Sequence, residues 1–386
     1  MVQVSDEDDP TATRTRRQRS NGTLTYPPEP ELPTLPFDLL PEILCRLPVK
    51  LLIQLRCLCK FFNSLISDPN FAKKHFQFSA KHHRLMVTSR NNRHDFVLHD
   101  SPIPSVFSTS TSVTQTQLDP PFTLARRNYV NATAIAMCSC DGIFCGELNL
   151  GYCFVWNPSI RKFKLLPPYK NPLEGDPFSI SFGYDHFIDN YKVVAISSKY
   201  EVFVNALGTD YWRRIENIPY YYYILQPGIF VGGTVNWMAS DIADLLFILS
   251  LDLEKESYQK LFLPDSENEN DWWSRNLSVL MLRDCLCVYE ASDLFFNVWI
   301  MKEYGNQESW TKLYSVPKMQ HRRFKAYTIS YIYEDDQLLL GIVDMQSSNT
   351  KLAVYDSKTG TLNIPEFEKT YEPIYSNVYI ESLISP

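Results

Sequence analysis

The chain has 386 residues, a hydrophobic fraction of 45%, an aromatic fraction of 14% and a formal net charge of −7 at pH 7. This length suits a small module followed by a large one, and the apolar content is sufficient for a sizeable core. The negative charge, which no basic stripe offsets, argues against nucleic acid as the main partner, and no apolar run approaches the ~18 residues that a membrane-spanning helix needs.

Residues 1–33 combine five prolines with mostly polar side chains, so we expect a disordered N-terminal lead. This lead starts with acidic residues and lacks the apolar stretch of a signal peptide, which predicts that no secretory leader is present. The chain is therefore expected in a reducing compartment, the cytoplasm, the nucleus or both. Its nine cysteines are expected to be thiols rather than disulfides.

Residues 34–78 carry the apolar pattern of short helices. Asp38 is a suitable N-cap for the first helix, Pro41 falls in its first turn, and Pro48 ends it. Two further helical segments follow, and Asp68 and Pro69 are expected to cap and begin another one. So small a unit cannot bury all of its apolar side chains by itself. The surplus predicts a surface that a partner covers.

From about residue 79 to the end, the sequence consists of short strands rich in aromatic and β-branched residues, separated by turn signals such as Asp141-Gly142. Strand–turn–strand units recur about every fifty residues, which is typical of a β-propeller. The turns of these units are marked by Asn157, Asn205, Asp252, Lys302 and Asp356. We therefore predict a mainly β protein, with a small N-terminal helical module at 34–78 and a propeller-like domain of about six blades at 79–386.

The last strand of the chain is expected to close the propeller. A propeller has no open edge when its first and last blades share strands, so we predict that residues 377–383 pair with strands near 84–98. The apolar residues Val378, Ile380 and Leu383 do not alternate strictly, which suggests a β-bulge near Glu381.

The helical region contains three consecutive patterns: LP-x-D-L-L-x-E-I-L-x-R-L-P-V-K, R-C-x-C-K and S-L-I-S-D-P-x-F. Together they resemble the F-box of plant F-box proteins. Leu51 and Phe62 depart from the usual form, yet both preserve an apolar helix face. The β region contains GIFCGELNLGYCFVWNPSIRKFKLLPP, FGYDHFIDNYKVVAI and YIESL, and these blocks resemble the F-box-associated domain of the same proteins, which are often labelled F-box/kelch-repeat. The ordinary kelch and WD signatures are absent.

This resemblance implies a non-catalytic, substrate-recognition subunit of an SCF (cullin-RING) ubiquitin ligase, with no cofactor. The F-box would dock on a Skp-type adaptor and through it on cullin, and the β domain would bind a target protein for ubiquitination and proteasomal degradation. The adaptor-binding residues that the resemblance implies are Leu35, Pro36, Leu39, Leu40, Ile43, Leu44, Leu47, Pro48, Val49, Leu52 and Leu55.

The residues that bind the target are not evident from the sequence, but three segments are candidates. Four consecutive tyrosines at 220–223 cannot all face inward on a strand, so two should be displayed. An acidic loop with two tryptophans and a small basic loop could each meet a partner, although solvated loops explain both as well. The candidate residues are Tyr221, Tyr223, Trp272, Trp273, Arg322 and Arg323.

Two alternative functions remain open, because a fold does not determine a function. The chain could be a propeller-type sugar-binding or enzymatic module with a helical appendage, or a pollen self-incompatibility receptor of the same architecture. The cysteine pairs Cys57/Cys59, Cys138/Cys140 and Cys285/Cys287 have C-x-C spacing, not the C-x₂-C spacing typical of structural zinc. We therefore expect buried thiols and no metal site.

Overall fold

The computed structural model describes the chain over these ranges: 39–79, 82–90, 96–108, 112–119, 137–147, 152–168, 177–197, 199–219, 221–264, 276–291, 295–317, 324–333, 337–347, 349–367 and 373–386. The chain divides into two compact units, residues 1–40 and residues 41–386. The second unit holds most of the helical residues and every strand. The expected disordered lead, 1–33, lies outside the described residues.

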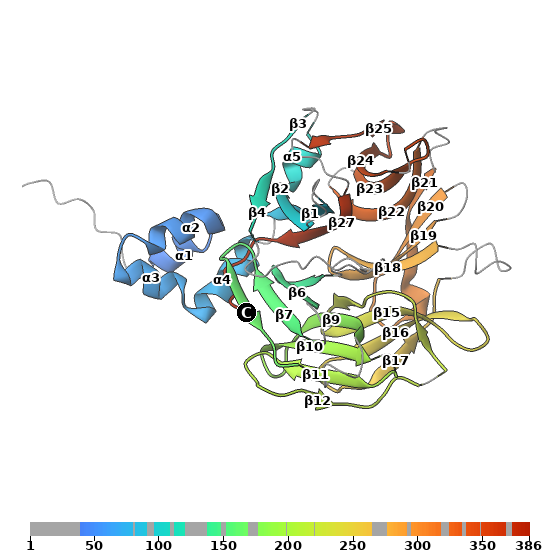
Figure 1. Ribbon diagram of the computed structural model, residues 1–386, viewed down its shortest axis with the longest axis horizontal. Coiled ribbons are helices and arrows are strands. Elements are labelled where there is room, and N and C mark those ends of the chain that lie inside the picture. The colour runs from blue at the N-terminus through green and yellow to red at the C-terminus, as the bar shows by residue number, and fades with distance from the viewer. Residues whose placement is uncertain are drawn as a thin grey trace, which may run out of the picture. The chain divides into compact units, whose positions relative to one another are not determined.

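Short helices occupy the N-terminal module, as the sequence predicts (Figure 1). They are α1 (Leu40–Leu44), α2 (Val49–Arg56), α3 (Lys60–Ile66) and α4 (Pro69–Ser79). The Asp68 carboxylate accepts hydrogen bonds from the backbone N–H groups of Asn70 (2.8 Å) and Phe71 (3.0 Å), which confirms the predicted cap of α4. The first helix is shorter than expected: it ends at Leu44, and a turn carries the chain on to Leu47.

Six antiparallel sheets form the blades of a β-propeller (Figure 1), which confirms the predicted fold class. We number blades in chain order, and strands within a blade by their order in the sheet. Blade 1 comprises β27 (Pro373–Ile380), β1 (His83–Arg90), β2 (Phe96–Pro102) and β4 (Thr116–Leu118). Blade 2 comprises β5 (Cys138–Cys140), β6 (Ile143–Glu147), β7 (Cys153–Asn157) and β8 (Lys162–Leu165). Blade 3 comprises β9 (Pro177–Asp185), β10 (Asn190–Ser197), β11 (Val202–Ala206) and β12 (Arg213–Arg214).

In blade 4 the first strand is split in two, and both halves pair with the second strand. Blade 4 comprises β13 (Tyr223–Ile224), β14 (Ile229–Val231), β15 (Thr234–Ser240), β16 (Leu246–Asp252) and β17 (Tyr258–Leu261). Blade 5 comprises β18 (Asn276–Leu282), β19 (Cys285–Ala291), β20 (Phe295–Met301) and β21 (Trp310–Pro317). Blade 6 comprises β22 (Phe324–Ile332), β23 (Gln337–Asp344), β24 (Thr350–Asp356) and β25 (Thr361–Asn363). The smaller elements are α5 (Ile103–Val106), η3 (Gln307–Ser309) and the parallel pair β3 (Ser112–Val113) with β26 (Glu366–Phe367).

The apolar core lies between neighbouring blades. One cluster joins Val194 of blade 3 to Trp237 of blade 4, and both side chains are fully buried. Another joins Phe144 of blade 2 to Tyr379 of the last strand, with ring centroids 5.0 Å apart. Each blade therefore depends on its neighbours to cover its faces, and the domain is stable only as a ring.

The repeat seen in the sequence corresponds to the turn between the third and fourth strands of blades 2 to 6. The Oδ1 atom of Asp252 accepts hydrogen bonds from the N–H groups of Glu254 (3.0 Å) and Lys255 (2.9 Å), and Asp356 makes the equivalent contacts with two backbone N–H groups. Asn157 accepts one such bond, from Ser159. A short carboxylate or amide side chain at the end of the third strand closes such turns, which explains why these residue types recur.

The C-terminal strand closes the ring, as predicted. β27 pairs antiparallel with β1 from Ile380 opposite His83 to Pro373 opposite Ser89. The register irregularity lies between Thr88 and Ser89, so the predicted bulge near Glu381 is wrong. The strand ends at Ile380, and the residues after it leave the sheet, which is why their apolar pattern does not alternate.

Residues beyond β27 make a second closing contact, with blade 2. The Asn157 amide, fully buried, donates hydrogen bonds to the carbonyl groups of Ser382 (3.1 Å) and Ile384 (2.8 Å). Gly142, which has a φ of 78°, lies directly against this segment, and a Cβ atom there would overlap the carbonyl oxygen of Ile380. The C-terminal residues therefore bridge blade 1 and blade 2.

A buried lysine joins blade 3 to blade 4. The ammonium of Lys192 lies 2.7 Å from Asp185 Oδ2 and 3.0 Å from Glu256 Oε1, and it donates a hydrogen bond to the Leu253 carbonyl. Burial alone would raise the pKa of Asp185, but hydrogen bonds from Lys192 and from two backbone N–H groups outweigh burial and hold that pKa below its usual value. The Asp185 side chain is 1% exposed, so its charge depends on this partner.

Replacing this lysine with an apolar side chain should destabilise the fold severely. Lys192→Met leaves the buried Asp185 carboxylate without its cation, whereas Glu256 keeps its pair with Arg213, and we expect a loss of about 3–5 kcal/mol in the free energy of unfolding. The matched control is Lys255→Met, because the Lys255 side chain is 72% exposed and its one ion pair among the described residues is with Asp252 on the same turn; it should change stability by less than about 0.5 kcal/mol. Urea denaturation of both variants measures the difference, and similar losses would contradict the prediction.

The hairpin between β5 and β6 contains a carboxyl group whose ionisation opposes folding. Asp141 accepts a hydrogen bond from the Tyr191 hydroxyl at 2.8 Å, and its φ is 51°. Burial raises the pKa of Asp141 above its usual value, and this hydrogen bond only partly offsets the rise. The folded chain therefore binds a proton at Asp141 more readily than the unfolded chain does.

Asp141→Asn should stabilise the protein near neutral pH, because asparagine keeps the hydrogen-bond acceptor and tolerates a positive φ without the cost of burying a charge. The wild-type penalty is present above the folded-state pKa of Asp141 and disappears as pH falls below about 4, the usual value for aspartate. The advantage in Tm should therefore shrink between pH 7 and pH 4. Melting curves of both chains across this range measure it, and a constant difference would contradict the argument.

Candidate functional site

The helical module displays some of its apolar side chains and buries others. Among the eleven residues that the resemblance implies for adaptor binding, Leu39, Ile43 and Pro48 are exposed, and Leu40, Leu47 and Leu55 are half-buried. Leu35 and Pro36 lie outside the described residues. These exposed and half-buried side chains are available to a partner.

Three of the expected adaptor-binding residues are buried in the free chain. Leu44, Val49 and Leu52 are 4%, 2% and 0% exposed, because they pack inside the helical module. They cannot present a surface to another protein without unfolding of the helices around them. Leu44, Val49 and Leu52 stabilise the packing of the helices, and exposed side chains adjacent in the sequence, such as Ile43 and Leu51, form the surface.

Other displayed apolar residues were not among the expected ones. Leu51 is 40% exposed, Leu58 69% and Phe61 47%. No helical spacing in the sequence identifies them, because Leu51 lies on α2 whereas Leu58 lies in the turn that follows this helix. A single exposed leucine needs no explanation, but several on a short helical unit indicate a surface that a partner covers.

Contacts from the last helix order this module. The backbone carbonyl of Leu47, which directly precedes Pro48, lies 2.9 Å from His75 Nε2. Burial lowers the pKa of His75 below its usual value, so its imidazole is neutral at physiological pH. Lys74 pairs with Glu42 of α1, and Lys73 of the same helix pairs with Asp189 in the turn between β9 and β10.

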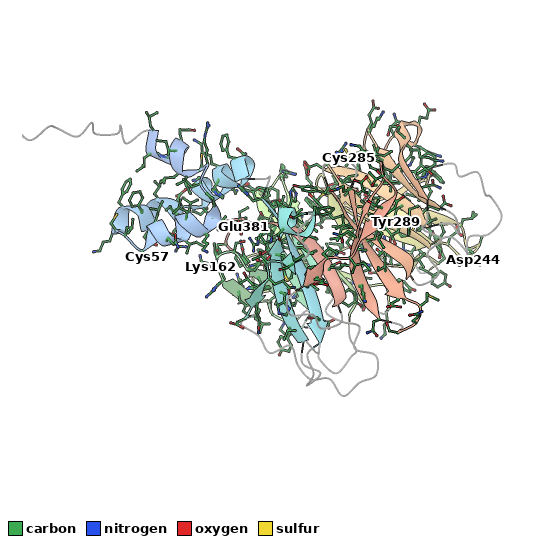
Figure 2. All side chains as sticks on the ribbon, turned by 90° about the horizontal axis from the view of Figure 1, so that it is seen from above. Cys57, Lys162, Asp244, Cys285, Tyr289 and Glu381 are labelled. Carbon is green, nitrogen blue, oxygen red and sulfur yellow. The ribbon has the colours of Figure 1, made fainter. Side chains whose placement is uncertain are left out.

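The β domain has two different ends. Turns that join the first strand of a blade to the second, and the third to the fourth, lie at one end, which we call the turn end. Connections from the second strand to the third, and from blade to blade, lie at the other, which we call the loop end. Figure 2 shows Lys162 and Glu381 on one side of the β domain and Asp244 on the opposite side. Because β1 begins opposite Ile380, the chain enters the propeller from the helices at the turn end.

Two candidate target-binding residues lie at the loop end. Tyr221 is 39% exposed and Tyr223 is 46% exposed, whereas Tyr222 between them packs against Phe247 with ring centroids 4.7 Å apart. The prediction that two of the tyrosines are displayed is therefore confirmed for these residues. Trp272, Trp273, Arg322 and Arg323 lie outside the described residues.

The cysteines follow the expectation of buried thiols only in part. Cys140 and Cys287 are buried on strands, whereas their pair members Cys138 and Cys285 are half-buried, and burial raises the pKa of the Cys287 thiol to about 12. Cys57 and Cys59 are exposed, so the expectation of buried thiols is wrong for this pair, which lies at the connection between α2 and α3 and not on a strand. Within the described ranges, no group of three or more His, Cys, Asp or Glu side chains could hold a metal ion. No helix in the described part of the chain is long and apolar enough to cross a membrane.

Comparison with known families agrees with both parts of the fold. Residues 32–74 match the F-box domain, and residues 95–386 match the F-box associated beta propeller domain. The chain therefore belongs to the family of proteins with an F-box associated beta propeller domain, and an F-box domain precedes this domain.

Plant proteins are similar to this chain along most of their length. F-box/kelch-repeat protein At3g23880 from Arabidopsis thaliana is 26% identical over 91% of this chain and 96% of its own length. F-box protein CPR1 from the same plant is 26% identical over 91% of this chain and 89% of its own length.

Solved structures give weaker likenesses. An oligogalacturonate lyase from Vibrio parahaemolyticus matches with a TM-score of 0.40 and 9% identity, covering 72% of this chain and 78% of its own. The SapL1 lectin matches with a TM-score of 0.40 and 10% identity, covering 75% of this chain and 96% of its own. At these scores neither likeness supports an inference about activity or ligand.

Proposed function

We propose that this chain is a substrate-recognition subunit of an SCF ubiquitin ligase that acts in the cytoplasm, the nucleus or both. The F-box helices dock on a Skp-type adaptor, which links the chain to cullin, and the β-propeller binds a target protein. The observation that carries this proposal is the presence in one chain of an F-box with displayed apolar residues, such as Ile43 and Leu58, followed by a closed propeller.

In this role the chain contributes position and no bond chemistry. Holding a target next to a ubiquitin-loaded enzyme raises the effective concentration of the target lysines, and this is enough to accelerate transfer. The six-bladed ring suits this task, because packed blades hold the loop end in a fixed relation to the turn end, where the chain arrives from the helices.

Reconstitution tests the proposal. The full chain is co-expressed with a Skp-type adaptor, a cullin and its RING subunit, and the complex is analysed by size exclusion. We expect the four proteins to elute together, and the complex to ubiquitinate the chain itself when the ubiquitin-activating and ubiquitin-conjugating enzymes are supplied. Failure to bind the adaptor, under conditions where a known F-box protein binds it, would refute the proposal.

A further inference from the structure

Exposed apolar side chains gather at the loop end of blade 4. This set contributes more large, exposed apolar residues than any other described blade end, and we call it the blade-4 patch. It consists of Tyr221 (39% exposed), Tyr223 (46%), Leu225 (53%), Ile242 (73%), Leu245 (63%) and Phe262 (53%).

Strand pairing brings the members of the patch together from three segments. Tyr223 pairs with Ser240 at the end of the second strand, and Leu225 donates a backbone hydrogen bond to Met238. Ser240 in turn lies opposite Leu246, at the other side of the loop that carries Ile242 and Leu245. Lys260 connects Phe262 to the rest, since its ammonium lies 5.7 Å from the Phe262 ring centroid and 5.8 Å from that of Tyr222.

The loop that displays Ile242 and Leu245 is held in one conformation. The Asp241 carboxylate accepts hydrogen bonds from the N–H groups of Ala243 and Leu245, each at 3.0 Å, and the Asp241 N–H donates to the Leu245 carbonyl. An ordered turn that points apolar side chains outward has already lost the conformational entropy that binding would otherwise cost. The patch is therefore preorganised for binding.

The charged side chains next to the patch have a net negative charge, which comes from Asp244. Lys260 is balanced by Asp241, at 3.6 Å, and lies over the face of Phe247. Asp244 stands exposed between Ile242 and Leu245, and its carboxylate makes no ion pair with any residue in the described ranges. A partner that covers this turn must bring a positive charge close to Asp244, or leave that carboxylate without a counterion.

We propose that the blade-4 patch is the docking surface for the target protein, and that it takes a segment in which apolar side chains adjoin lysine or arginine. This inference rests on the proposed function. A second copy of the chain fits less well, because a two-fold symmetric contact would bring the same acidic turn from both copies to one interface. The patch also lies at the end of the domain opposite to the one at which the chain enters from the helices, so a target bound there does not compete with the adaptor.

Fluorescence polarisation with three labelled peptides tests the proposal on the full chain bound to its adaptor. The peptides have equal length and combine Leu and Phe with Lys, Leu and Phe with Glu, or Ser with Lys. The variants are Ile242→Ala with Leu245→Ala, and Asp244→Lys, and the control is Phe187→Ala, which truncates a 77% exposed side chain at the turn end. Adaptor binding is measured for each variant in the same preparation.

We expect only the apolar basic peptide to bind the wild-type chain. Its affinity should fall about tenfold or more in the double alanine variant and stay unchanged in the control. Asp244→Lys should reverse the preference, so that the apolar acidic peptide binds instead. Equal binding of all three peptides, or no effect of the patch variants, would overturn the proposal. So would a wild-type dimer that the double variant converts to a monomer, whereas loss of adaptor binding by the wild-type chain would count against the proposed function instead.

Discussion

A chain that carries Ile43→Asp together with Leu58→Asp is expected to lose adaptor binding while keeping its fold. Both side chains are displayed, 44% and 69% exposed, so a carboxylate at either site is solvated in the free protein. In the complex the same carboxylates would be buried without a partner. Two such substitutions should weaken adaptor binding by about a hundredfold or more, as measured by calorimetry with the purified adaptor.

Two controls separate this outcome from misfolding. Leu44→Asp changes the neighbour of Ile43, but Leu44 is 4% exposed, so this variant should unfold the helical module, with a loss of helical circular dichroism. Tyr211→Asp places a carboxylate at a 65% exposed aromatic position of the β domain and should leave adaptor binding unchanged. If Ile43→Asp with Leu58→Asp binds the adaptor as the wild type does, these residues are not part of the adaptor surface.

Deletion of residues 374–386 is expected to unfold the whole β domain, not only its last strand. The deletion removes nearly all of β27 and opens the edge of β1. It also removes Tyr379, Leu383 and Ile384, which are 4%, 6% and 8% exposed, and leaves the buried Asn157 amide without three of its acceptors. Burial of each large apolar side chain contributes about 1.5–3 kcal/mol, so the total is comparable with the 5–15 kcal/mol stability of a typical domain.

The matched control removes only residues 385–386, of which Ser385 is exposed and lies beyond these contacts. This shorter deletion should keep a normal melting curve, whereas the longer one should give an insoluble chain or a chain with no cooperative transition. A truncated chain that stays soluble and melts within about 2 °C of the full one would show that the ring does not need this strand.

Much of the architecture could be predicted because local chemistry repeats. Asp252 and Asp356 end the third strands of their blades and close equivalent turns. The regular spacing of such residues in the sequence therefore indicated the regular spacing of the blades. The pairing of β27 with β1 followed from the cost of an open edge. The cap at Asp68 followed from the affinity of a short carboxylate for the first N–H groups of a helix.

The faces of the short helices were harder to predict. Leu44 and Ile43 are adjacent and equally apolar, yet one is buried and the other displayed. A helix of five residues has too few turns for its pattern to define a buried stripe, so the sequence alone does not show which of the two leucine-rich faces is covered. The blade-4 patch could not be predicted from the sequence for another reason. Tyr223 and Leu245 are distant in sequence, and only the register of β13, β15 and β16 brings them together.

The pairing of β1 with β27 also determines when, during synthesis of the chain, the β domain can complete its fold. β1 is the first strand of the domain to leave the ribosome and β27 is the last, so nearly the entire β domain must be translated before the two can pair. The helices precede all of this and involve mostly local contacts, which form fast. A chain that terminates prematurely within the β domain would therefore carry the helices that come first and lack the closed ring. Such a chain would expose unpaired strands to the proteolytic machinery and would be removed before it could occupy an adaptor for long.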